Sequence, residues 1–303
     1  MLRLGALALL WGSGFLLIKV ALEGMSPIQI VLGRLVTAAV VMLPVIAIQG
    51  QRLPRRLAPW GHLAAMAVIT NIAPYFLYAW GEQRITSSLA GVLNATTPLF
   101  TLLLAVSTRT ERPSLFRLLG LALGFAGVVV LAAPWQDAGL GGSFLGIGAA
   151  LLASACYAAG YVYARRFLTG RALPALVLST GQVLAGSLLL GAAAPVVAVE
   201  SITLTPSVLA SVLTLGVLGT GIAYVLNYRL IEDEGATAAS TVTYLLPIVA
   251  VALGVVVLGE PAAWNLLVGA AIILLGVALS EGRLAKPSPP GLSHRHVELE
   301  HSP

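Results

Sequence analysis

Residues 71–98 read NIAPYFLYAWGEQRITSSLAGVLNATTP, and residues 220–247 read TGIAYVLNYRLIEDEGATAASTVTYLLP. The second segment is a copy of the first, shifted by 149 positions without a gap. The shift aligns three residue types that rarely coincide by chance in a chain rich in Ala and Gly: Tyr75 with Tyr224, Pro98 with Pro247, and Glu111 with Glu260. Such a repeat decides the architecture. We interpret the chain as two homologous halves, residues 1–136 and 142–282.

The composition indicates an integral membrane protein. Of the 303 residues, 58% are hydrophobic and only 10% are charged, and the mean hydropathy is +0.94. A soluble domain carries about 25% charged residues. The net charge of +5 is therefore interpreted as loop charge facing a cytoplasm, and no nucleic-acid partner is expected. The single cysteine, Cys156, excludes an internal disulfide.

The sequence predicts an all-α integral membrane protein with ten transmembrane helices. A helix needs about 20 apolar residues to cross a ~30 Å hydrocarbon core. Ten stretches meet this need: 4–22, 28–48, 61–81, 88–107, 115–133, 144–164, 173–194, 207–228, 238–258 and 262–280. Lys19 interrupts the first stretch, which argues for a membrane helix over a signal peptide. The polar end, residues 283–303, is predicted to be a disordered cytoplasmic tail.

Positive charge predicts the orientation. With the N-terminus inside, 14 of the 17 basic residues fall on the cytoplasmic side, and only Lys19, Arg34 and Arg84 do not. Both termini are then cytoplasmic, and we expect the membrane to be a bacterial inner membrane. Five helices per half is an odd number, so the second half enters the bilayer upside down. Two inverted five-helix repeats around a central cavity can expose one site to either face in turn.

Polar residues repeat on matching helix faces in both halves. Asn71, Tyr75 and Tyr78 share one face of the third helix, and Thr220, Tyr224 and Asn227 occupy the equivalent positions of the eighth. Polar side chains in membrane helices turn inward. We expect a nearly uncharged, aromatic-rich cavity lined by Trp11, Ser13, Asn71, Tyr75, Tyr78, Asn94, Thr97, Tyr157, Tyr161, Tyr224, Asn227, Thr243 and Tyr244. The alternative is that these groups only hold helices together.

Prolines and glycines within the predicted helices indicate where helices bend and where they pack closely. Pro98 and Pro247 are predicted to bend their helices, either as gating hinges or as static bends. Gly120 with Gly124, and Gly269 with Gly276, predict close helix contacts, within the bundle or at a dimer face.

Arg34 lies about two turns into the second helix. Its guanidinium is expected to reach the outer interface or a carboxylate such as Glu23. Contact with a substrate carboxylate is the alternative.

Several short motifs resemble the EamA family of the drug/metabolite transporter superfamily. They are Trp11-Gly12-Ser13-Gly14-Phe15 with Lys19, Ser26-Pro27 followed by Arg34, Thr97-Pro98, Glu111-Arg112-Pro113 and Gly259-Glu260-Pro261. The resemblance implies ten helices in two inverted repeats, cytoplasmic termini, and a cavity built mainly by helices 1, 3, 4, 6, 8 and 9. It also implies export of amino acids or related metabolites. The aromatic residues make the chain similar to the YddG branch, which exports aromatic and other neutral amino acids.

The expected function is therefore transport without a cofactor. We expect export of small amino acids such as threonine, methionine and phenylalanine by alternating access, by a monomer or weak homodimer. No Asp or Glu lies in the middle of a predicted helix, so no proton- or sodium-coupling carboxylate is evident. No metal cluster, phosphate-binding loop or catalytic motif is present, and no enzyme activity is expected. The alternatives are a nucleoside, purine or multidrug exporter, a lipid-modifying membrane enzyme, and a structural or signalling subunit.

Overall fold

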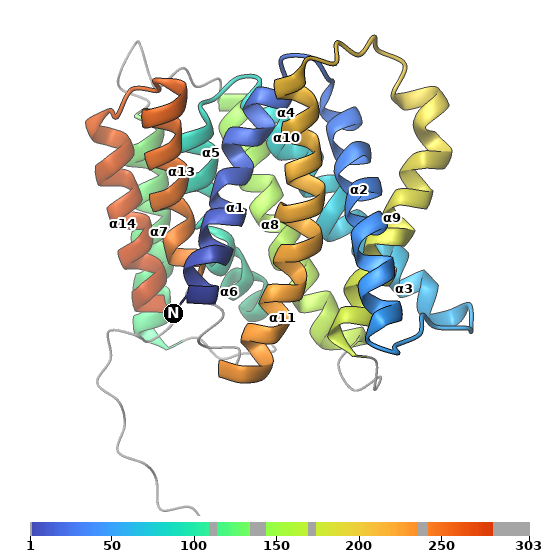
Figure 1. Ribbon diagram of the computed structural model, residues 1–303. Coiled ribbons are helices and arrows are strands. Elements are labelled where there is room, and N and C mark those ends of the chain that lie inside the picture. The colour runs from blue at the N-terminus through green and yellow to red at the C-terminus, as the bar shows by residue number, and fades with distance from the viewer. Residues whose placement is uncertain (1, 109–113, 134–143, 169–173, 235–241, 281–303) are drawn as a thin grey trace, which may run out of the picture.

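The computed structural model describes residues 2–108, 114–133, 144–168, 174–234 and 242–280. Every regular element in these ranges is a helix, and the helices stand side by side in one bundle (Figure 1). Glu111, the junction between the proposed halves and the predicted tail 283–303 lie outside the described ranges.

Within the described ranges, eight helical stretches are long and apolar enough to cross a membrane. They are α1 (Leu2–Ala21), α2 (Pro27–Ile48), α3 (Ala58–Ala67) with η1 (Val68–Ile72) and α4 (Ala73–Glu82), α5 (Ser87–Asn94) with α6 (Thr97–Ser107), α7 (Leu115–Ala132), α8 (Phe144–Phe167), α9 (Ala175–Val197), and α10 (Pro206–Gly216) with η2 (Val217–Ile222) and α11 (Ala223–Glu234). Two shorter apolar helices follow, α13 (Val242–Leu258) and α14 (Trp264–Ser280). The chain is thus an all-helical, multi-pass membrane protein, and each predicted stretch contains a helix.

Two stretches contain a π-helical turn at the same place in the internal alignment. The turns η1 (Val68–Ile72) and η2 (Val217–Ile222) begin 149 positions apart. In η1 the proline that follows contributes, because Pro74 has no N–H to donate to the Thr70 carbonyl. The equivalent residue after η2 is Ala223, so a π turn forms at this place without a proline as well. Regular helices had been predicted at both places, so the π turns are a correction to the sequence interpretation.

The two equivalent prolines have different effects on their helices. The predicted helix 88–107 is broken, because α5 ends at Asn94 and α6 begins at Thr97. The ring of Pro98 excludes the carbonyl of Asn94 from a regular helical bond, which places Pro98 in the first turn of α6. Pro247 instead lies inside the uninterrupted helix α13.

Glycines bring α7 and α14 into backbone contact on one side of the bundle. The helices α2, α3 and α9 lie on the opposite side (Figure 1). A methyl group placed on Gly120 would lie 2.6 Å from the Gly276 carbonyl oxygen, and one on Gly127 would lie 3.0 Å from that of Gly269. Numbers rise along α7 as they fall along α14, so these helices run antiparallel. The predicted small-residue contact is confirmed, and it lies within the bundle.

A carboxylate from the α13–α14 connection caps a helix far away in sequence. Gly259, with a φ of 66°, turns the chain back after α13. The side chain of Glu260 then accepts hydrogen bonds from the N–H groups of Ser87 (2.7 Å) and Ser88 (2.9 Å) and from the Ser88 hydroxyl (2.5 Å). A negative charge at a helix N-terminus satisfies unpaired donors and complements the dipole. Glu260 therefore ties α13 to the start of α5.

Candidate functional site

Three of the predicted residues meet across the bundle. The hydroxyl groups of Tyr75, on α4, and Tyr224, on α11, lie 3.3 Å apart. The amide nitrogen of Asn71, in the π turn before α4, donates to Tyr75 at 3.2 Å and to Tyr224 at 3.3 Å. Tyr75 and Tyr224 are the residues that the internal alignment equates, so equivalent side chains of the two halves touch each other.

Gln182, on α9, completes this contact and was missed by the sequence interpretation. Its amide nitrogen donates to the side-chain oxygen of Asn71, and also to the hydroxyl of Thr70 at 2.7 Å. The only signal in the sequence was a glutamine within a long apolar helix. With Gln182 in place, Asn71 is completely buried yet hydrogen-bonded on both sides of its amide.

Arg34, on α2, joins the same group of side chains. Its Nε donates to the Thr220 hydroxyl at 2.8 Å, and its guanidinium carbon lies 3.8 Å from the centre of the Tyr75 ring. The contact expected with Glu23 is wrong, because these two contacts hold the side chain inside the bundle. We use the name inner polar cluster for Arg34, Thr70, Asn71, Tyr75, Gln182, Thr220 and Tyr224.

A second contact lies around Tyr78. Its hydroxyl donates to the side-chain oxygen of Asn94 at 3.0 Å and lies 2.9 Å from the Ser154 hydroxyl. Its ring meets Phe15 edge-on, with centroids 5.4 Å apart, and stacks with Tyr157 at 6.3 Å. Tyr157 also packs against the apolar cluster that contains Tyr75. The Tyr157 ring therefore links the Tyr78 contact to the inner polar cluster. The sequence interpretation did not include Ser154 and Phe15 among the site residues.

Among the described residues, the other predicted site residues belong neither to the inner polar cluster nor to the contact around Tyr78. Trp11 packs against apolar residues of α1, α11 and α13, and Tyr244 packs against the large core cluster. The hydroxyls of Ser13 and Thr97 donate to the carbonyls of Leu10 and Asn94 in their own helices. Tyr161 is 66% exposed, and Asn227 and Thr243 are half-buried.

In this conformation the central residues are covered by one another. Asn71 is 0%, Tyr75 5% and Tyr78 3% exposed. Their hydroxyl and amide groups satisfy each other, so no water is needed to compensate for burial. A water-filled cavity lined by these residues stays a prediction.

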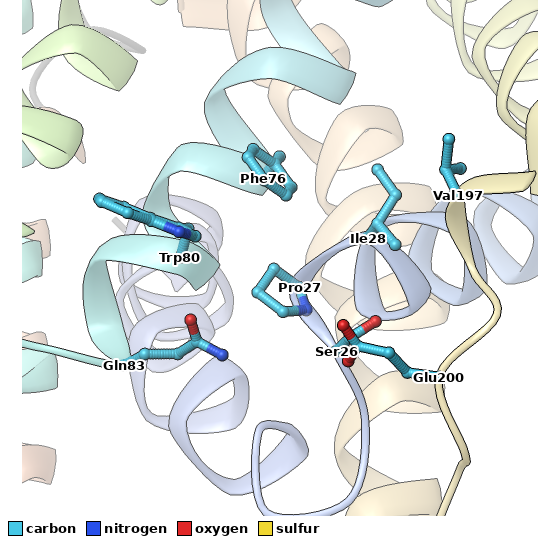
Figure 2. Close-up of a pocket in the computed structure, with 8 residues that line it drawn as sticks. All are labelled: Ser26, Pro27, Ile28, Phe76, Trp80, Gln83, Val197 and Glu200. Atoms are coloured by element: carbon cyan, nitrogen blue, oxygen red, sulfur yellow. The ribbon is translucent and has the colours of Figure 1, made fainter.

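A hollow of about 470 Å³ opens at the end of the bundle where α2 starts and where α4 and α9 end. Figure 2 shows the rings of Phe76 and Trp80 on one side and Ile28 and Val197 on the other, with Pro27 between them. Polar and apolar groups share its walls, because Ser26, Gln83 and Glu200 also line it. The predicted cavity residues do not line this hollow. Across the described part of the chain, no three His, Cys, Asp or Glu residues gather as metal ligands.

Comparison of the sequence with known proteins identifies its family. The sequence matches the EamA-like transporter family over residues 3–133 and again over 144–281. It is 28% identical to an uncharacterized transporter of Archaeoglobus fulgidus, over 88% of this chain and 93% of that protein. It is 30% identical to the uncharacterized inner membrane transporter YedA of Escherichia coli K12, over 84% and 81% of the two chains.

Two further similarities extend over almost the whole chain. A protein of Streptantibioticus cattleyicolor, named a probable terminal-alkyne amino-acid exporter, is 29% identical over 93% of this chain and 94% of its own. One crystal structure superposes with a TM-score of 0.65 at 22% identity, covering 92% and 95% of the two chains, and supports the fold alone. Two family matches that together span most of the residues show that the chain is a membrane transporter belonging to the EamA-like transporter family.

Proposed function

We propose that the chain exports small neutral and aromatic amino acids across a bacterial inner membrane by alternating access. The moving parts are two inverted five-helix repeats, residues 1–136 and 142–282, that together form ten membrane crossings around one site. The observation that carries the proposal is the direct contact between the equivalent residues Tyr75 and Tyr224, whose hydroxyls lie 3.3 Å apart. Equivalent side chains can meet in this way at an axis that relates two halves.

Helix directions support the inverted arrangement. The helices α7 and α14, which the internal alignment equates, run antiparallel through their glycine contacts. The internal alignment also equates the span formed by α5 and α6 with the span that contains α13, and α5 runs antiparallel to α13, because Gly91 faces Ala250 and Gly254 faces Ser88. Equivalent helices that run in opposite directions are expected when one repeat is upside down.

The strength of the inner contacts suits a switch between two conformations. Hydrogen bonds between membrane helices average about 0.6 kcal/mol each, because alternative partners exist inside the bundle. The bonds that join Asn71, Tyr75 and Tyr224 can therefore be exchanged for bonds to a substrate at small cost. The proposed closed state is the one in which these groups bind each other.

The chemistry of the site suits an amino acid. Hydroxyl and amide groups can bind an ammonium and a carboxylate, and the rings of Tyr78, Tyr157 and Phe15 can pack against an apolar side chain. Export of an amino acid is what the name of the Streptantibioticus relative states for that protein. Movement follows the substrate gradient, both termini face the cytoplasm, and the working unit is a monomer or weak homodimer.

Counter-flow in liposomes tests the substrate. Vesicles containing purified protein are loaded with unlabelled threonine, methionine or phenylalanine, and entry of the labelled amino acid is compared with entry into protein-free vesicles. Entry above that background is expected for at least one of the three. Background entry for all three, with counter-flow of a nucleoside, purine or cationic dye, would replace this proposal by the wider drug/metabolite alternative.

A further inference from the structure

The guanidinium of Arg34 is firmly held but only partly used. Its Nε donates to Thr220, and its plane lies against the Tyr75 ring. The two terminal nitrogens carry four of its five N–H donors. Within the described part of the chain neither nitrogen has a hydrogen-bond acceptor, and no carboxylate pairs with the group. A fork of four donors is thus left for another molecule.

This unpaired charge lies well inside a membrane helix. Arg34 follows the first residue of α2 by seven positions, which is about 10 Å along the helix axis. Its side chain is only partly buried, beside the fully buried Thr220. Ionisable residues at such positions are costly and usually mark the path of a substrate or ion.

The second half has a neutral residue in the corresponding place. Arg34 donates to Thr220, and Gln182 donates to Asn71, the residue that the internal alignment equates with Thr220. An amide at this position therefore makes the same bond to the facing π turn. Packing alone does not require a positive charge there.

Neighbouring glycines confirm that the two positions correspond. Gly33 precedes Arg34 and faces Val212, while Gly181 precedes Gln182 and faces Leu63. Leu63 and Val212 are themselves 149 positions apart, as are η1 and η2. The halves thus share one arrangement of backbone and partner, and differ in that the first carries a cation.

We propose that Arg34 binds the carboxylate of the transported molecule through its two terminal nitrogens. The planar fork matches the two oxygens of a carboxylate, and lysine does not reproduce that geometry. Tyr75 and Thr220 act as positioning residues, since one supports the plane of the guanidinium and the other fixes its Nε. This inference rests on the proposed transport through the Tyr75–Tyr224 contact, and it narrows the substrates to small molecules that carry a carboxylate.

The test compares acids with their uncharged amides. Binding to the purified full-length protein in detergent is measured by ligand-induced thermal shift for phenylalanine and phenylalaninamide, and for indole-3-acetate and indole-3-acetamide. The key variant is Arg34→Gln, which installs the side chain that the second half already tolerates. We expect this variant to bind the acid about 10- to 100-fold more weakly while binding of the amide is unchanged. Arg34→Lys should lie between the two proteins.

Arg84 supplies a matched control. Its guanidinium also lies over a ring, 3.7 Å from that of Trp80, but its terminal nitrogen donates to the Trp80 carbonyl and to the side chain of Gln83. Arg84→Gln should therefore leave the preference for acids unaltered. Size-exclusion profiles and the unliganded Tm show whether each variant is folded.

Each outcome separates this inference from the proposed function. If phenylalanine binds and Arg34→Gln binds it equally well, or loses acid and amide alike, the carboxylate role is overturned while amino-acid export stands. If only indole-3-acetate binds, and binding depends on Arg34, amino-acid export is overturned and the carboxylate role stands. If the unaltered protein prefers neither acid over its amide, the carboxylate role is rejected.

Discussion

Replacing Glu260 by alanine should destabilise the protein strongly, because it uncovers the N-terminus of α5. The carboxylate accepts three hydrogen bonds, two of them from the backbone N–H groups of Ser87 and Ser88. Ser87 and Ser88 are both 0% exposed, so water cannot replace the lost acceptor in the folded state. Leaving a buried donor unsatisfied costs about 1–3 kcal/mol.

Two such donors set the scale of the effect. The sum is about 2–6 kcal/mol, and we expect a value in the lower half of that range, about 3 kcal/mol, because some relaxation will occur. Glu260→Gln keeps one acceptor oxygen but turns an NH₂ group toward a donor, so it should cost about half as much. The N-cap bond from Leu89 to Thr86 does not depend on Glu260 and should survive.

Equilibrium unfolding in mixed detergent micelles with rising SDS measures this loss of unfolding free energy. The Tm, followed by tryptophan fluorescence, should fall by about 6 °C, at about 2 °C per kcal/mol. Glu23→Ala is the matched control, because that carboxylate is exposed in a loop. A double-mutant cycle with Ser88→Ala should give a coupling energy above about 0.5 kcal/mol. A loss below about 0.5 kcal/mol for Glu260→Ala would refute the capping argument, since surface changes reach that size.

Three further changes probe the packing of the bundle. Gly276→Ala should cost about 1–3 kcal/mol, because its new methyl group meets the α7 backbone, while Gly148→Ala, with open space around it, should be neutral in the same SDS titration. Glu82→Met should raise the unfolding free energy by about 1 kcal/mol, because it removes two carboxyl oxygens that are buried without a hydrogen-bond partner, and a loss in that titration would contradict this. Tyr75→Phe and Tyr224→Phe, combined in a double-mutant cycle, should show a coupling of about 0.6 kcal/mol, and additive losses would mean that their contact adds no stability.

Local patterns in the chain were enough to predict the helices and several of their contacts. Runs of apolar residues predict membrane helices because the bilayer sets a minimum length. The patterns of Gly120 with Gly124 and of Gly269 with Gly276 predict close helix contacts, and the structure places such a contact between α7 and α14. The shared face of Asn71 and Tyr75 follows from helical periodicity, and these two side chains do bind each other.

The partners of these residues depended on the tertiary structure. No local pattern pairs Gln182 with Asn71, which is 111 positions away, or Ser154 with Tyr78. Periodicity tells which face of a helix is polar, but it contains neither the rotation nor the height of one helix against another. Those are set by packing all the helices at once.

The sequence by itself therefore determined a duplicated, helical membrane protein with polar residues on inward faces, because length, hydropathy and periodicity are local properties. Only the tertiary structure decided that the helix before Pro98 breaks, that Arg34 faces Thr220 instead of Glu23, and that Glu260 caps α5. The contacts of Arg34 and Glu260 join residues distant in sequence, so their energies exist only once the helices are assembled. The clash of a proline ring is local, but the helix breaks near Pro98 and continues through the equivalent Pro247, so the proline alone does not determine a break.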